Sequence, residues 1–293
     1  NFKPDYTPDL LLSQMFTCHF SVYSAEIIRQ VNGIRTGYDG AQDHDLALRL
    51  SEIVSQGQVV HIPRVLYHWR EVPGSTAMNI DQKPRAPLAG IRAVSDALHR
   101  RNIQGTVSSD PLSPTVYVSR LQPRDRSKVT LVLYSDDTKY TKKCIRSIRK
   151  HTSYENYEIL LCANPKQKST MERICSDPQN AGICRMLFSD MPLTRLQFNN
   201  LAVSTVQTER IVFLDTRVWP VTQNWLEEFC ATLELDDSVA AVGGLIYYSD
   251  KLVFHGGIIT GLLGAAGVSH KHYHCDSPGY LGRLHSIQQL SAV

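Results

Sequence analysis

The stretch that decides the fold opens with VTLVLYSDD at residues 129–137. Its first six residues are apolar, aromatic or β-branched, and small and acidic residues end the run, so a buried strand is predicted. Residues 138–150, TKYTKKCIRSIRK, follow with apolar side chains on one helical face and lysines and arginines on the other. This pattern predicts an amphipathic helix with a basic outer face. A solvated face is one interpretation of these cations, and contact with anionic lipid is the other.

The same alternation of strand and helix continues along the chain. Apolar runs predict strands at residues 158–162, 184–188 and 210–215, and helical spacing predicts helices at 168–175 and 197–206. Strands that alternate with helices need crossover connections, and such connections produce a mainly parallel sheet. The predicted fold of this part is therefore α/β, with a Rossmann-like parallel sheet flanked by helices.

Ligands of such sheets bind beyond the carboxyl ends of the strands. Polar residues that directly follow the predicted strands are therefore candidates for a ligand site. They are Ser135, Asp136, Asp137, Asn164, Asp215 and Thr216. Carboxylates, a hydroxyl and an amide at one edge of a sheet predict a polar ligand.

Composition limits the class of protein. The chain has 293 residues, a net charge of +3 and 42% hydrophobic residues, which fits two globular domains of roughly 150 residues each. The mild charge, without clustered arginines or an aromatic platform, argues against nucleic acid as a partner. No apolar run of about 18 residues predicts a membrane span, and the first residues lack the features of a signal peptide. Both ends are expected to be cuts through a longer protein.

Cysteine and histidine usage gives two further expectations. None of the seven cysteines forms a C-x-x-C pair, and several lie in predicted strands or on apolar helix faces. Reduced thiols and a cytoplasmic location are therefore predicted. His270, His272 and His274 would share one face of an extended segment, which makes them a candidate metal site. A surface loop is the alternative.

The N-terminal part is predicted to be a smaller α+β unit. Short apolar segments include a strand at residues 16–23, and a helix is predicted at residues 46–54. Asp43 and Asp45 precede that helix, where acidic residues interact favourably with the helix dipole. A structural role is one interpretation of both residues. The other is catalytic, because helix amides can hold a carboxylate in the fixed position that a general base needs.

A second group of polar residues in the N-terminal part lies near residue 70, where a predicted strand meets a loop. Residues 59–70 predict a strand pair or a bent strand, and a loop rich in Gly, Pro and Ser follows. His68, Arg70, Ser75 and Thr76 cluster there. Arginine, hydroxyl groups and protonated histidine all donate hydrogen bonds to phosphate oxygens, so diphosphate binding is one interpretation. An exposed loop with a satisfied histidine is the other.

Two blocks of this sequence resemble inverting family 2 glycosyltransferases of the GT-A fold, in particular large multi-module bacterial enzymes of surface-polysaccharide synthesis. The first block contains GAQDHDL at residues 40–46 and HIPRVLYHWR at 61–70, and it is similar to the acceptor half of such a domain. The second contains NNLA at 199–202, HGG at 255–257 and PGY at 278–280, and it is similar to the nucleotide-sugar half.

The resemblance implies transfer from a nucleotide-diphospho-sugar donor of the UDP-sugar type to a glycan or lipid-linked acceptor, in cell-surface polysaccharide or lipopolysaccharide synthesis. It implies a cytoplasmic site of action, peripheral to the inner membrane face, with further modules of a longer chain as partners. Asp43 matches the family's general base, which takes the proton of the acceptor hydroxyl. Substrate or diphosphate contacts are implied for Asp45, His68, Arg70, Ser135, Asp137, Asn164, Asn200, Asp215 and Arg217.

Two positions depart from the family pattern. Residues 162–164 are CAN, without the acidic residue that holds the base or ribose, and residues 214–217 are LDTR in place of the metal motif. Mg²⁺ or Mn²⁺ prefers several oxygen ligands, and Asp215 is the single carboxylate here. Arg217 could instead neutralise a diphosphate. The module is therefore expected to be metal-independent, or to be a catalytically decayed binding or scaffold module.

The two halves stand in the reverse of the family's order. The chain is expected to hold the acceptor-side part of one module at residues 1–77 and a helix-strand appendage and linker at 78–123. The nucleotide-sugar part of a second module is expected at 124–293. A single permuted GT-A unit is the alternative.

Overall fold

The computed structural model describes residues 3–17, 19–68, 85–135, 137–260, 266–286 and 291–292. The chain forms two compact units. Unit 1 combines Asn1–Leu121 with Gly243–Val293, and unit 2 is the continuous segment Gln122–Val242. The expected division placed the C-terminal segment with the second module, whereas here that segment packs with the N-terminal part.

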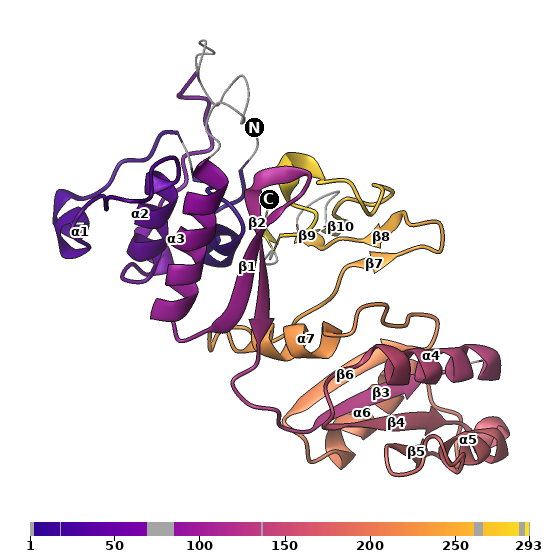
Figure 1. The fold of residues 1–293 in the computed structure, drawn as a ribbon. Coiled ribbons are helices and arrows are strands. Elements are labelled where there is room, and N and C mark those ends of the chain that lie inside the picture. Colours follow the sequence, from indigo (N-terminus) through magenta and orange to yellow (C-terminus); the bar gives the residue numbers. More distant parts are fainter. Residues whose placement is uncertain are drawn as a thin grey trace. The chain divides into compact units, whose positions relative to one another are not determined.

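Unit 2 is built on a four-stranded parallel sheet with the strand order β5-β4-β3-β6 (Figure 1). The strands are β3 (Val129–Tyr134), β4 (Tyr157–Ala163), β5 (Cys184–Phe188) and β6 (Arg210–Asp215). The first five residues of β3 are all buried, as expected for a strand that is covered on both faces. The predicted α/β fold with a parallel sheet is confirmed.

Helices cover both faces of this sheet. One core is shared by α4 (Thr138–His151), α5 (Lys168–Cys175), α7 (Trp225–Leu233) and inward residues such as Leu131. The other core joins Val132 to Phe198 of α6 (Arg195–Thr205). Neighbouring strand residues face opposite cores because side chains alternate along a strand. The chain reverses its direction across the sheet between β5 and β6, so a right-handed crossover puts α6 on the opposite face from α4 and α5.

Unit 1 has α+β character. Its helices are η1 (Pro8–Leu12), α1 (Ala25–Gln30), α2 (Gln42–Ser51), η2 (Gln56–Gln58), α3 (Ala86–Arg100) and η6 (Tyr280–Gly282). Its strands are β1 (Gln104–Asp110), β2 (Ser113–Gln122), β7 (Ile246–Tyr247), β8 (Val253–His255), β9 (Ile258–Thr260), β10 (Ala266–Val268) and β11 (Ser291–Ala292). A Cβ on Gly90 would lie 1.7 Å from the Tyr117 hydroxyl, so this glycine allows α3 to pack closely against β2.

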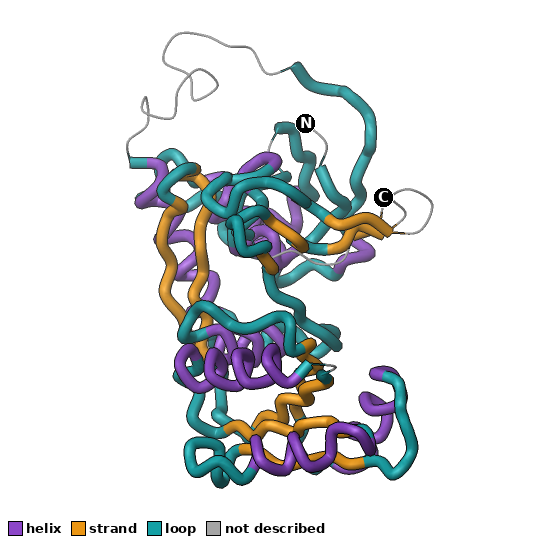
Figure 2. The backbone as a smooth tube through the Cα atoms, turned by 90° about the vertical axis from the view of Figure 1, so that its right-hand side faces the viewer, coloured by secondary structure: helices purple, strands orange, loops and turns teal. Residues whose placement is uncertain are grey.

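Two strands predicted for unit 1 are wrong. Residues 16–23 form turns and irregular backbone, apart from Cys18, which lies outside the described residues. Residues 59–68 form a loop in which Val60 and Val65 are 81% and 83% exposed. In Figure 2 this loop is the teal tube that leads into the longest grey trace. An apolar run becomes a strand only when a neighbouring strand completes its backbone hydrogen bonds, and the described residues supply none here. None of the helices in the described ranges has both the length and the apolar character needed to cross a bilayer.

Candidate functional site

The strand order places a topological switch point between β3 and β6. The chain runs outward from β3 to β4 and β5, then returns to β6 on the other side of β3. Tyr134 pairs in register with Asp215 at the carboxyl ends of these two strands. Ser135 and Asp215 therefore flank the position at which open α/β sheets bind their ligands.

Ser135 builds the turn between β3 and α4. Its side chain is buried, and its Oγ donates to Asp137 O at 2.9 Å and accepts from Asp137 N at 3.1 Å. The Thr141 hydroxyl also donates to this oxygen. Asp137 is exposed and caps α4, because its Oδ1 accepts from Lys139 N at 2.6 Å. Asp136 lies outside the described residues, and the rest of this turn is held by local hydrogen bonds.

Gln167 joins the ends of β3 and β4. Its Nε2 donates to Ser135 O at 2.6 Å, and its Oε1 accepts from Asn164 N at 3.1 Å. Asn164 in turn accepts from Leu193 N at 2.7 Å and donates to Leu193 O at 3.2 Å, which ties in the segment after β5. Gln167 was missed in the sequence, although Asn164 and Gln167 have the types and spacing of a capping box around η4 (Pro165–Gln167).

Two arginines hold the carboxylate of Asp215. Oδ1 accepts from Arg217 N at 2.9 Å and from Arg217 Nε at 3.0 Å. Oδ2 accepts from a terminal nitrogen of Arg217 at 2.7 Å and from one of Arg195 at 3.2 Å. The hydrogen bonds from Arg217 outweigh partial burial and hold the pKa of Asp215 below its usual range. Arg195 was missed because α6 was predicted to begin two residues later, whereas the capping box of Thr194 and Gln197 makes Arg195 its first residue.

This arrangement does not fit a divalent cation. Such an ion needs several oxygen ligands, and both oxygens of Asp215 already accept hydrogen bonds from guanidinium groups that would repel a metal. Asp137, which follows β3, already caps α4 through its carboxylate. The side chains of Arg217 and Arg195 are 69% and 46% exposed, so a ligand in solution can reach them. Guanidinium groups bind phosphate oxygens well.

Asn200 lies apart from this group. It is exposed in the middle of α6, whereas Phe198 and Ala202, two residues away on either side, are buried against the sheet. Within the described ranges, no hydrogen bond joins Asn200 to Asn164 or Asp215. Its predicted role in substrate binding stays a prediction.

Asp43 lies in unit 1, at the second residue of α2. Its side chain is half-buried, and its Oδ1 accepts from His44 N at 2.9 Å. The His44 ring stacks on Tyr117 with 5.5 Å between ring centroids, and its Nε2 donates to Leu11 O at 2.6 Å. Burial, with a contribution from the Asp43 charge, raises the pKa of Tyr117 to about 12. Asp43 is thus a fixed, partly accessible carboxylate at a helix N-terminus.

Asp45 is enclosed by the protein. Its side chain is 0% exposed, and Arg49 donates to its Oδ2 through Nε at 3.0 Å and a terminal nitrogen at 2.8 Å. Arg35 forms a further ion pair with it. Burial alone would raise the pKa of Asp45, but the hydrogen bonds from Arg35 and Arg49 lower it. These contacts give Asp45 a structural role and leave no exposed surface for a substrate.

The other polar residues predicted for unit 1 lie near the edge of what the structure describes. His68 is exposed in the loop of residues 59–68. Arg70, together with Ser75 and Thr76, lies outside the described residues. The structure therefore places Asp43, Asp45 and His68 in unit 1, and it gathers Ser135, Asn164, Asp215 and Arg217 at one edge of unit 2.

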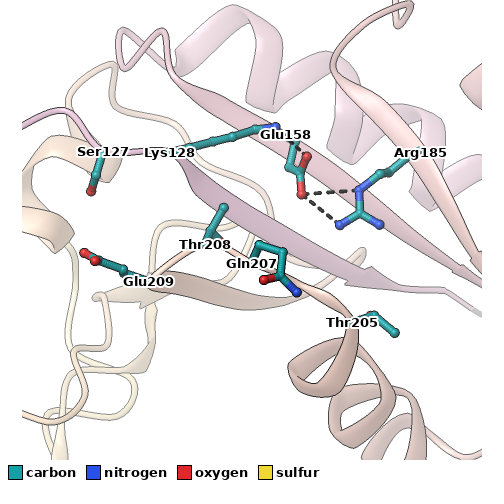
Figure 3. A pocket seen from close by; sticks show the side chains of 8 residues that line it. All are labelled: Ser127, Lys128, Glu158, Arg185, Thr205, Gln207, Thr208 and Glu209. Carbon is teal, nitrogen blue, oxygen red and sulfur yellow. Dashed lines mark hydrogen bonds and ion pairs between the residues drawn. The ribbon is translucent and has the colours of Figure 1, made fainter.

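A cavity of 490 Å³ lies at the opposite, amino edge of the unit 2 sheet (Figure 3). Its central carboxylate, Glu158, accepts from Lys128 Nζ at 2.7 Å, from the Thr130 hydroxyl at 2.9 Å and from Arg185 at 2.9 Å. Burial would raise the pKa of Glu158, but these hydrogen bonds outweigh it and lower the pKa to about 2. Lys128 and Arg185 both pair with Glu158, and the position of this cavity is not the one at which parallel sheets bind ligands.

The predicted histidine group does not form as an extended face. His270 and His272 have positive φ angles of 54° and 67°, so the segment turns. The Nε2 of His270 accepts from Tyr280 N at 3.1 Å, and its Nδ1 shares a hydrogen bond with Ser269. His274 instead lies with Cys275 and Asp276, and their potential ligand atoms are within 4.8 Å of one another at the surface.

No family model matches the chain. The chain is 33% identical over 299 residues to the uncharacterized protein y4gI of Sinorhizobium fredii, which covers 100% of this chain and 32% of that protein. It is 32% identical over 267 residues to the O-antigen biosynthesis protein RfbC of Myxococcus xanthus, which covers 91% of this chain and 20% of that protein. The resemblance to proteins of surface-polysaccharide synthesis is thus confirmed, and the chain spans less than a third of either relative.

A solved structure is also similar to this chain. It is the mannosyltransferase PcManGT from Pyrobaculum calidifontis in complex with GDP-Man and Mn²⁺, with a TM-score of 0.34 and 13% identity. The similarity covers 56% of this chain and 45% of the mannosyltransferase.

Proposed function

We propose that this chain is part of an inverting glycosyltransferase that uses a nucleotide-diphospho-sugar donor in cell-surface polysaccharide or lipopolysaccharide synthesis. The observation that carries the proposal is the carboxyl edge of the unit 2 sheet, where Arg195 and Arg217 meet at Asp215 beside the switch point. The 32% identity to an O-antigen biosynthesis protein supports the pathway. The donor would be of the UDP-sugar type, and the reaction would take place in the cytoplasm.

The two arginines would bind the donor's diphosphate without a metal. A guanidinium group can donate two parallel hydrogen bonds to phosphate oxygens. Asp215 holds both guanidinium groups in place, and the Ser135 turn and Asn164 would border the nucleoside. In the transfer step, the arginines would stabilise the negative charge that develops on the departing nucleoside diphosphate.

Asp43 would act as the general base. It would take the proton of the acceptor hydroxyl while that oxygen attacks the sugar carbon from the face opposite the diphosphate. Its place in the first turn of α2 and its hydrogen bond from His44 N hold the carboxylate still. In the parent chain, Asp43 would serve the module whose acceptor half it belongs to, and the unit 2 edge would serve the module that follows. The acceptor would be a glycan or a lipid-linked glycan.

Calorimetric titration of this chain with UDP tests the donor site. We expect binding that Mn²⁺ leaves unchanged and that Arg217→Ala weakens by at least about tenfold, because a hydrogen bond to a charged group contributes about 1.5–3 kcal/mol. Arg185→Ala at the amino edge is the matched control and should bind UDP as the unsubstituted chain does. Absence of UDP binding, or equal weakening by both substitutions, would contradict the donor site.

The parent enzyme tests the general base. Asp43→Asn should abolish sugar transfer while donor binding and thermal stability stay close to those of the unsubstituted enzyme, because the amide keeps the shape but cannot take the proton. Sugar transfer at an undiminished rate in this variant would remove Asp43 from the role.

A catalytically decayed module that only binds or organises partners is the second candidate. It is favoured by the complete occupation of the Asp215 oxygens and by Ala163, which stands where the resemblance implies an acidic residue. Tight UDP binding that Mn²⁺ enhances would exclude the decayed module. Glycan binding in a chain that shows no affinity for UDP would favour it.

A further inference from the structure

The outer surface of α4 carries cations without carboxylates. The helix sequence is TKYTKKCIRSIRKH, and it contains neither Asp nor Glu. Cys144, Ile145 and Ile148 are buried in the core of unit 2. The opposite, exposed surface carries Lys139, Lys142, Lys143, Arg146, Arg149 and Lys150.

Neighbouring elements extend this surface. η4 and α5 follow β4, and α5 shares the core on the same face of the sheet as α4. They add the exposed residues Lys166, Lys168 and Arg173 against one exposed carboxylate, Glu172. We call the nine cations of α4, η4 and α5 the basic face. These elements carry a net charge of +8 in a chain whose net charge is +3, so the remainder of the chain is net negative.

The cations of α4 repel one another. Lys139 and Lys143, Lys142 and Arg146, and Arg146 and Lys150 are like charges at a spacing of four residues, which destabilises a helix. Within the described ranges, no ion pair joins a cation of α4 to a carboxylate. The contacts that they do make are to neutral groups: Arg149 donates to the Gln179 amide at 3.1 Å, and Lys143 lies over the Trp219 ring at 3.9 Å. An anionic partner would relieve this repulsion.

We propose that the basic face binds the anionic surface of a lipid bilayer. Basic residues clustered on an amphipathic helix attract anionic headgroups, and each cation adds to the affinity. The apolar side of α4 is already buried in the core, so the attachment is electrostatic and needs no insertion of the helix. Tyr140, which is 40% exposed on the same helix, is a side chain of the type that lies at headgroup level. A single exposed aromatic residue on α4 does not form the stacking platform that single-stranded nucleic acid requires.

Co-sedimentation of the whole chain with vesicles tests this proposal. We expect the chain to bind phosphatidylcholine vesicles that contain phosphatidylglycerol and not to bind pure phosphatidylcholine vesicles. Binding should disappear at about 0.5 M salt, where screening reduces the range of electrostatic attraction to a few ångströms. Equal binding to both kinds of vesicle, or binding that persists at high salt, would overturn the proposal.

Charge reversal localises the contact. Lys142→Glu with Arg146→Glu should weaken binding to the anionic vesicles by about tenfold or more, from the contribution of each cation near the surface. The control, Arg29→Glu with Lys271→Glu, changes the net charge equally at exposed positions of unit 1 and should keep the affinity. Equal weakening in both variants would overturn the assignment of the contact to the basic face. Displacement of the chain from the vesicles by duplex DNA, added at the same concentration of negative charge as the anionic lipid, would overturn the assignment of lipid as the partner. Titration of the same variants with UDP measures the donor site independently of vesicle binding, so a failure of one proposal can be told from a failure of the other.

Discussion

Asp43 and Asp45 show how two neighbouring carboxylates on one helix acquire different roles. Asp43 is half-buried with one local hydrogen bond, whereas Asp45 is fully enclosed between Arg35 and Arg49. Removing one partner of a buried ion pair leaves an uncompensated charge, so Asp45→Asn should lower the free energy of unfolding by about 3 kcal/mol. Asp43→Asn should change it by less than about 1 kcal/mol. Urea unfolding measures both, and equal losses would contradict this division of roles.

Glu158 makes the stability of unit 2 depend on pH. Its pKa in the folded protein is lowered to about 2, so its contribution is complete above the ordinary value of 4.5 and is lost as the pH falls toward 2. Lys128 and Arg185 are about half exposed, and solvent screening reduces the contribution to about 1–2 kcal/mol. Glu158→Gln should therefore destabilise the protein at neutral pH and have little effect near pH 2.

Urea unfolding at several pH values measures this dependence. Glu172→Gln, an exposed change of the same kind on α5, is the control and should leave the profile unaltered. A Glu158→Gln variant that follows the pH profile of the unsubstituted protein would show that these hydrogen bonds do not contribute to stability.

At the scale of elements, the end of α5 and the start of β5 bring two thiols together. The Sγ atoms of Cys175 and Cys184 are 3.1 Å apart and partly accessible. A hydrogen bond from Cys184 lowers the pKa of Cys175, and the same contact raises the pKa of Cys184. Hydrogen peroxide should therefore join this pair as a disulfide, each thiol losing one hydrogen while the peroxide is reduced to two waters.

Peptide mapping by mass spectrometry under non-reducing conditions detects that linkage. The internal controls are Cys144 and Cys162, which are buried and whose pKa burial raises to about 12. They should stay reduced under the same treatment. A chain in which Cys144 oxidises first, or in which Cys175 and Cys184 remain separate thiols, would contradict the expected pairing.

At the scale of the whole molecule, unit 2 is continuous in sequence and unit 1 is not. Unit 2 contains its own hydrophobic core on each face of the sheet. A fragment of residues 122–242, about 120 residues long, is large enough to bury a stable core, so it should fold alone. Circular dichroism should show one cooperative thermal transition. A broad, non-cooperative transition would show that this fragment depends on the rest of the chain.

Residues 1–121 provide the comparison for that experiment. They form one compact unit with the C-terminal segment, in which Val253 is 0% and Leu284 is 3% exposed. Expressed without residues 243–293, they should unfold with less cooperativity than the intact chain, because part of their apolar surface would face water.

Local sequence by itself determined most of unit 2. Its residues predicted α5 at 168–175, β5 at 184–188 and β6 at 210–215, and the structure has the same bounds. Each element is predicted by the spacing of its apolar residues and by the residues that begin and end it, all of which lie within a few residues of one another. The alternation of strands and helices predicted the parallel sheet. The parallel sheet in turn predicted that Asn164 and Asp215 lie at one edge, where the strands end. The basic outer face of α4 was likewise visible in the sequence.

Tertiary structure alone decided the features that depend on distant partners. The ion pair between Arg195 and Asp215 and the burial of Asp45 against Arg35 require side chains from separate elements. Residues 59–68 have an apolar pattern but no described partner strand, so the pattern alone did not make them a strand. The packing of residues 243–293 with the N-terminal part joins the two ends of the chain. Periodicity and capping act over a few residues, whereas such contacts exist only after the chain has folded.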